Sequence, residues 1–84
     1  MARHRIISGP DESALRSAAD NGGPLTFTLE GRGAITLERT STVLDGGKHG
    51  WRLIGHIGDG ELHYEVDGYH PRTGRGFLTE EPHD

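Results

Sequence analysis

The chain has 84 residues, with thirteen acidic and nine basic side chains and a formal net charge of −4 at pH 7. A chain of this length forms one domain. Because only 31% of the residues are hydrophobic, we expect the free energy gained by burying the core only just to offset the conformational entropy that the chain loses on folding. Cysteine is absent, which excludes a disulfide framework, a thiolate metal site and a thiol nucleophile.

The charge and the hydropathy pattern limit the partners. A net negative charge argues against nucleic acid, whose binding depends mostly on a basic surface. No stretch approaches the ~20 apolar residues that cross a bilayer, and the first residues lack the apolar centre of a signal peptide. We therefore expect a cytoplasmic protein without membrane contact, folded as a single domain over residues 1–84 with a frayed tail at 81–84.

A short strand followed by a helix is expected at the beginning of the chain. Residues 5–8 (RIIS) form a β-branched run that favours a strand. The next residues suit a helix start, with Pro10 at the first helical position and two acids after it. The helix should stop at residues 21–23 (NGG), where glycine can adopt the left-handed conformation of a C-terminal cap.

Residues 25–37 predict a hairpin. Apolar and polar residues alternate on both sides of residues 31–33 (GRG), and a three-residue loop there would pair Phe27 with Leu37. If the second strand continues through residues 37–44, Arg39 and Ser41 occupy inward positions. That polar stretch indicates a bulge, an edge location or a strand end near Arg39.

Residues 51–69 contain the strongest local signal, Asp59-Gly60 between two alternating runs, which is typical of a type I′ hairpin. This turn would pair Leu53 with Val66 and His56 with His63. A slip of one residue would turn the apolar set outward, so the register is well specified. Residues 67–68 and 70–74 predict a further turn, followed by a last, edge strand over residues 75–80.

The expected fold class is α+β: an antiparallel meander sheet of four to six short strands with one short N-terminal helix. One sheet face collects most of the large apolar side chains, and a ten-residue helix cannot cover all of it. Either the sheet curls toward a small barrel or a second chain meets it. The residues expected on this face are Phe27, Leu29, Ile35, Leu37, Trp51, Leu53, Ile57, Leu62, Tyr64 and Val66.

A histidine pair is the sharpest candidate for chemistry. Directly opposite on neighbouring strands, His56 and His63 would have Cβ atoms ~4.5–5.5 Å apart, with Glu65 on the same face. Two imidazoles and a carboxylate can hold a catalytic zinc or iron ion. However, the spacing matches no metal motif and the face is expected to be open to water, so an ordinary polar face is favoured and no cofactor is expected.

RNA binding is a second alternative, because Tyr69 precedes Arg72 and Arg75, and exposed aromatics beside arginines can stack bases. The net charge argues against this use.

The favoured function is a non-enzymatic, protein-binding domain: an adaptor, an inhibitor or a subunit of an assembly. It would engage its partner, or a second copy in a homo-oligomer, through acidic turns and an uncovered sheet face or edge. A basic nucleic-acid-binding surface of an enzyme is one partner that the charge permits. The expected contact residues are Trp51, Tyr69, Phe77, Asp59, Glu61, Glu65 and Asp67.

Overall fold

The computed structural model describes residues 2–59 and 62–82. Within them the sheet has seven strands instead of the expected four to six, and one α-helix, so the α+β class is confirmed. The elements are β1 (Ala2–Ser8), α1 (Glu12–Asn21), β2 (Leu25–Leu29), β3 (Gly33–Leu37), β4 (Arg39–Asp45), a short 3₁₀ turn η1 (Gly47–His49), β5 (Trp51–His56), β6 (Leu62–His70) and β7 (Arg75–Pro82).

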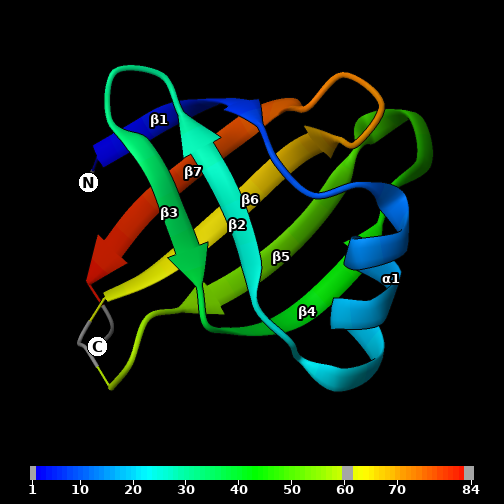
Figure 1. Cartoon of the computed structure of the whole chain (residues 1–84), viewed down its shortest axis with the longest axis horizontal. Helices are drawn as coiled ribbons and strands as arrows, with labels where there is room; N and C mark the ends of the chain where they lie inside the picture. Colours follow the sequence, from blue (N-terminus) through cyan, green and yellow to red (C-terminus); the bar gives the residue numbers. More distant parts are fainter. Residues whose placement is uncertain (1, 60–61, 83–84) are drawn as a thin grey trace.

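The order of strands across the sheet is β3-β2-β1-β7-β6-β5-β4, and every neighbouring pair is antiparallel (Figure 1). The expected meander is therefore interrupted, because the first strand lies between β2 and the last strand. β3 and β4 stand at opposite ends of this order, yet only Glu38 separates them in the chain. The two ends of the sheet must meet there, and the sheet curls into a half-barrel.

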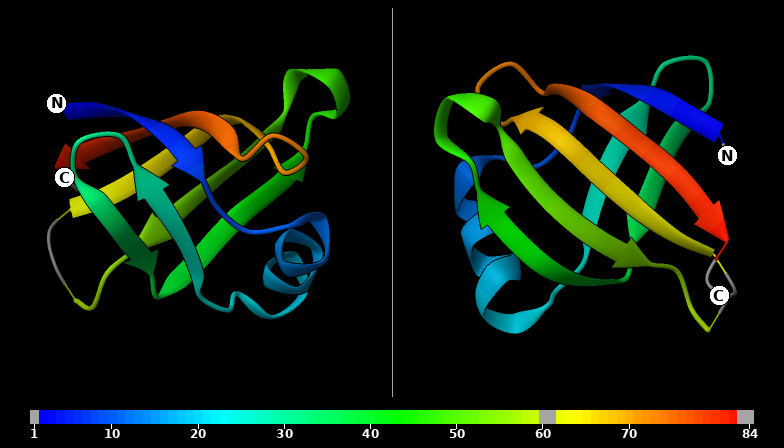
Figure 2. Two further views of the ribbon diagram at one scale, coloured as in Figure 1. Left: turned by 45° about the horizontal axis from the view of Figure 1, so that its top comes forward. Right: turned by 180° about the vertical axis from the view of Figure 1, so that it is seen from behind.

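The junction of β3 and β4 is closed by a hydrogen bond in which the Glu38 amide donates to the His56 carbonyl, at 2.9 Å. From this point β3 and β4 diverge, and α1 lies on the open side of the half-barrel (Figure 2). The helix end is tied to the edge of the sheet because the Thr40 amide donates to the Gly22 carbonyl, at 3.1 Å. No helix in the described part of the chain is long and apolar enough to span a bilayer.

The core fills the space between the curled sheet and the helix. α1 adds two small or medium side chains, Leu15 and Ala18, and its neighbours on the sheet are wholly or nearly buried. Most of the expected apolar face is confirmed, but Ile35 and Ile57 are only partly buried and Leu62 is 41% exposed. The buried hydrophobic set is Ile6, Leu15, Ala18, Leu25, Phe27, Leu29, Leu37, Trp51, Leu53, Tyr64, Val66, Tyr69 and Leu78.

The helix ends follow from its local sequence. Asp11 is the N-cap, and its side chain accepts a hydrogen bond of 2.9 Å from the Ala14 amide. Pro10 therefore lies before the cap instead of at the first helical position. Gly22 has φ of +67° and its amide donates to the Ala18 carbonyl, so the predicted glycine C-cap is confirmed.

The register predicted for the hairpin at residues 25–37 is wrong by two residues. Phe27 pairs with Ile35, and Leu25 takes the place opposite Leu37. The pairing begins at Leu29 and Gly33, because Gly31, with φ of +76°, gives the chain its reversal one residue earlier than expected. A shift of two residues keeps every side chain on its predicted face, so the predicted burial pattern does not depend on this error.

The polar stretch after β3 is explained by a break between two strands at Glu38. β4 is an edge strand with a register shift between Ser41 and Leu44, so a strand end, an edge and a bulge all occur here. The break also changes the phase of the side chains: Thr40 points inward and is buried, whereas Arg39 and Ser41 are exposed. The prediction that those two residues face inward is wrong.

The central hairpin is confirmed where it is described. Leu53 pairs with Val66, Gly55 with Tyr64, and His56 with His63. The type I′ turn expected at Asp59-Gly60 lies partly outside the described residues.

The last strands differ from expectation in two ways. β7 is not an edge strand but lies between β1 and β6, and it continues through Glu81 and Pro82, which were expected in the frayed tail. Residues 67–68 do not form a turn, because β6 continues through them with an irregularity at Gly68, where φ is +64°. The turn itself occupies residues 71–74.

Candidate functional site

A hollow of about 650 Å³ opens at one end of the half-barrel, where three separate segments converge. We call it the mouth hollow. The first turn of α1, the connection from β4 to β5 and the turn from β6 to β7 surround it. The lining residues are Glu12, Asp45, Gly47, Trp51, His70, Pro71, Arg72 and Thr73.

Trp51 forms the inner wall of the mouth hollow. It is 4% exposed and belongs to the core, as expected from its place on the apolar face of the sheet; its expected role as a contact residue stays a prediction. It pairs with Tyr69 across a register shift in the β5–β6 ladder. This shift depends on close backbone approach: a Cβ on Gly50, where φ is +85°, would lie 2.6 Å from the Gly68 carbonyl carbon.

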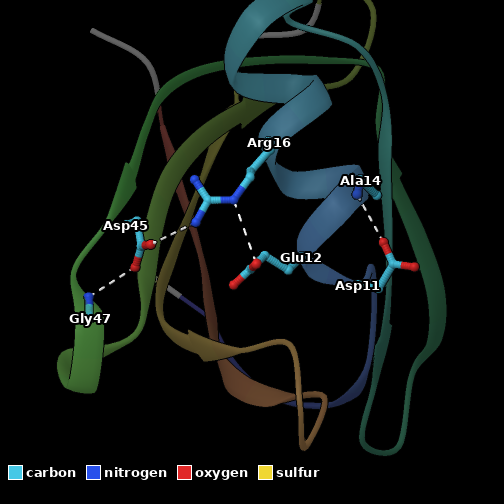
Figure 3. Close-up of polar contacts among 6 residues, drawn as sticks. All are labelled: Asp11, Glu12, Ala14, Arg16, Asp45 and Gly47. Carbon is cyan, nitrogen blue, oxygen red and sulfur yellow. Dashed lines mark hydrogen bonds and ion pairs between the residues drawn. The ribbon is translucent and has the colours of Figure 1, made fainter.

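Arg16 joins the helix to the end of β4 (Figure 3). It also lies beside Trp51. Its Nη2 lies 3.4 Å from Oδ2 of Asp45, its Nε lies 3.6 Å from Oε2 of Glu12, and its guanidinium carbon lies 5.4 Å from the centroid of the Trp51 ring. Asp45 also accepts a hydrogen bond of 2.9 Å from the Gly47 amide, which fixes the start of the 3₁₀ turn. The arginine side chain is 59% exposed, so these ion pairs contribute little to stability.

The mouth hollow has walls of opposite charge. α1 and the end of β4 contribute the carboxylates Glu12 and Asp45, which share the charge of Arg16. The turn from β6 to β7 contributes Arg72 and the imidazole of His70. A ligand group that enters can therefore place its apolar part against Trp51 and its polar groups on either wall.

Tyr69 holds the structure beneath the mouth hollow. It is 0% exposed, it meets the Phe27 ring edge-on with centroids 5.2 Å apart, and its hydroxyl donates a 2.7 Å hydrogen bond to the Pro10 carbonyl. Burial, with a smaller contribution from the negative charge of Asp11, raises the pKa of Tyr69 to about 12. Tyr69 was expected at a contact surface, but it is instead a core residue that anchors the chain entering α1.

Three of the other expected contact residues lie together on the outer face of the sheet. Phe77 pairs with Asp67 across β6 and β7, and Glu65 is two residues before Asp67 on the same face. Arg52 lies within 3.5 Å of Glu65 and 3.4 Å of Asp67, so it neutralises part of their charge. Phe77 is 37% exposed, and the Arg3 guanidinium lies 4.1 Å from its ring centroid.

The remaining acidic residues are separate from this group. Asp59 is exposed beyond the end of β5, and Glu61 lies outside the described residues. The structure thus divides the expected contact set between the outer face and the core. A contact role for the exposed members stays a prediction.

The histidine pair has the predicted position, with ring centroids 6.4 Å apart on the outer face. Its neighbours differ from the proposed ligand set: Nε2 of His63 lies 3.0 Å from Glu81, while Glu65 is engaged by Arg52. Over residues 2–59 and 62–82, no three His, Asp or Glu side chains are grouped so that they could hold a metal ion.

The residues of the RNA alternative are not on one surface. Arg72 lines the mouth hollow and Arg75 is exposed, but Tyr69 is buried and cannot stack a base without the core opening.

Sequence reasoning missed the residues that surround Trp51. Glu12 and Arg16 were available as a pair of opposite charge four residues apart on a helix, which is a recognisable signal. Asp45 gave no such signal, because its contact with Arg16 spans 29 positions of the chain.

Comparison with known proteins gave no match to a family model, to a curated protein or to a solved structure. The class of the protein therefore comes from its own topology: an α+β domain with a curled seven-stranded antiparallel sheet, described over residues 2–59 and 62–82, and a helix beside its open side.

Proposed function

We propose that this protein is a non-enzymatic, protein-binding domain and that the mouth hollow receives side chains of its partner. One observation carries the proposal: three segments far apart in the sequence surround a nearly buried tryptophan and still leave about 650 Å³ open beside it. Tryptophan, tyrosine and arginine are the residue types most enriched at binding hot spots, and hot spots lie in well-packed pockets.

The mouth hollow supports this role better than the acidic outer face does. Glu65 and Asp67 already share Arg52, so they present less charge to a basic partner than the sequence suggested. Exposed charges also contribute more to the association rate than to affinity. In the mouth hollow, by contrast, an entering side chain would remove apolar surface from water. Whether the domain acts as an adaptor, an inhibitor or an assembly subunit depends on the partner.

Affinity capture from the cells that produce the protein tests this function. The wild type is compared with Thr73→Trp, which fills the mouth hollow, and with Glu30→Trp, an equally bulky change in the exposed loop between β2 and β3. A partner protein captured in stoichiometric amount is purified, and its affinity for each form is measured. We expect Thr73→Trp to weaken binding by at least about tenfold and Glu30→Trp to have no effect.

Three results would overturn the proposal. Either no protein is retained in stoichiometric amount, or the partner binds Thr73→Trp as tightly as Glu30→Trp. A small molecule found with the wild type by intact mass measurement, in place of a protein, would also contradict protein binding, because ~300–1,000 Å³ is the usual range of small-ligand sites.

A further inference from the structure

The curled sheet has two edges, and they differ in how they are protected. β3 and β4 are the outermost strands, and each has backbone amides and carbonyls on the side away from its neighbour. Such groups can pair with a strand of another chain, so proteins usually protect their edges with charges, prolines, bulges or covering segments.

The β4 edge carries several of these devices. Its ladder is shifted between Ser41 and Leu44, and Thr42 has a φ of +53°, which bends the strand away from a regular pairing line. Near its start, the Thr40 amide is already used by the Gly22 carbonyl at the end of α1. These features disfavour regular pairing of a second strand along this edge.

The β3 edge has none of these devices within its five residues. Its sequence GAITL contains no charge and no proline, and its pairing with β2 is regular throughout. Successive amides of a strand point to alternate edges. Since the Glu38 amide points away from β2, to His56, the amides of Thr36 and Ala34 point to the same open side.

Nothing in the described part of the chain covers that open side at Ala34 and Thr36. Both residues are exposed, and neither contributes to a backbone hydrogen bond outside the β2–β3 ladder. Ile35 between them points inward but is only half-buried, because the sheet ends beside it. The edge thus offers free backbone groups together with an incompletely covered apolar side chain.

We propose that a second copy of this chain pairs with β3 in antiparallel orientation, about a two-fold axis at Ile35. The strand is complementary to itself: Ile35 would lie opposite its own copy, and Ala34 opposite Thr36 of the second copy. Each pair is uncharged, so no like charges face each other along the strand. The pairing stops at the ends of the strand, because Arg32 belongs to the turn and contacts Glu80, and the Glu38 amide is already bound to the His56 carbonyl.

This pairing joins the two half-barrels into one continuous sheet and covers both copies of Ile35. It is isologous, as most homodimer contacts are. Five residues a side make a small contact, so the dimer is expected to be weak. No residue of β3 lines the mouth hollow, so a result that contradicts this dimer would not contradict the proposed partner binding, and the reverse also holds.

The test uses the protein itself as the probe. Sedimentation equilibrium up to ~1 mM should show the mass rising from the 9.1 kDa monomer toward twice that value. Over the same range, the amide signals of Ala34 and Thr36 should shift in NMR spectra. The variant Ala34→Lys/Thr36→Lys places lysine opposite lysine in the proposed register, and its self-association should be weaker by about tenfold.

A charge-exchange experiment tests the register. Ala34→Glu/Thr36→Glu should also associate weakly with itself, but an equimolar mixture of the glutamate and lysine variants should form the mixed dimer. The matched control is Leu44→Lys on the β4 edge, an exposed position where added charge should leave the mass unchanged. Circular dichroism and thermal melting show that each variant is folded.

Three results would overturn the dimer. The first is a wild type that remains a 9.1 kDa monomer with unchanged amide signals over the whole range. The second is a lysine variant that associates as strongly as the wild type, and the third is a mixture that shows no more association than its components. If the monomer persists and Thr36→Pro abolishes capture of a partner protein, the edge serves that partner and the second copy is excluded.

Discussion

Raising the pH above about 10 is expected to destabilise the protein through one group, the phenol of Tyr69. The hydroxyl is buried and donates to the Pro10 carbonyl, and the pKa in the folded state is about 12 against 10.0 for the free side chain. Below pH 10 the phenol is protonated in both states, so its contribution to stability is complete. Between pH 10 and 12 the unfolded chain loses this proton and the folded protein keeps it.

The size of the effect follows from the shift. Stability falls wherever the folded state binds more protons than the unfolded state as the pH rises, here by about 1.4 kcal/mol per pH unit. Over two units the loss approaches about 2.7 kcal/mol, a large part of the ~4–13 kcal/mol expected for a chain of this length. The loss should be complete as the pH passes 12.

Urea unfolding followed by the fluorescence of Trp51, the single tryptophan, measures this at pH 7 and at intervals from pH 9 to 12. Tyr69→Phe should be less stable by about 1 kcal/mol at pH 7, because its hydrogen bond is lost. Between pH 10 and 12 it should lose less stability than the wild type. An equal slope in the wild type and in Tyr69→Phe would refute the reasoning.

Three further predictions concern packing and capping. A Cβ on Gly55 would lie 2.5 Å from Cδ1 of Leu37, so Gly55→Ala should lower the free energy of unfolding in urea by about 1–3 kcal/mol. A double-mutant cycle with Leu37→Ala should show a favourable coupling, because the smaller side chain relieves the contact. Additive effects of the two substitutions would contradict the contact. Leu78→Ala should lower the free energy of unfolding by about 2–5 kcal/mol, because Leu78 is buried in a central strand. Phe77→Ala, on the outer face, should lower it clearly less, and similar losses in the two variants would argue against the inward placement of Leu78. Asp11→Ala should lower stability by about 1 kcal/mol through loss of the N-cap, whereas Asp11→Ser should retain most of it; equal losses in these two variants would mean that the cap does not act through its side-chain oxygen.

What the sequence allowed us to predict depended on the range of the interactions. The Gly22 cap involves residues a few positions apart, and the Leu53–Val66 pair lies within one hairpin whose turn signal is local; both were found. The register of the first hairpin was missed because two glycines in positive φ, at positions 31 and 33, allow more than one loop of suitable length. Alternation of side chains has a period of two, so it could not discriminate between registers that differ by two residues.

The central position of β7 could not be inferred in the same way. Its pairing with β1 joins residues 70 or more positions apart, as in the pair Arg3 and Thr79, and no local pattern reports such a contact. The same limit concealed the mouth hollow, because its walls come from three segments. Tyr69 was misassigned for a related reason: the irregularity at Gly68 turns the ring inward, away from the surface.

The position of β7 also determines the order in which the domain can assemble. Strands β1 to β3 form one ladder and β4 to β6 another, and in the described sheet β7 is the only strand that pairs with both; apart from it, the Glu38 amide donates one hydrogen bond to the His56 carbonyl. Each ladder can therefore form early from neighbouring segments, but the half-barrel cannot close until residues 75–82 pair on both sides. Because the decisive contacts span nearly the whole chain, we expect slow, all-or-none folding in which the last strand sets the rate.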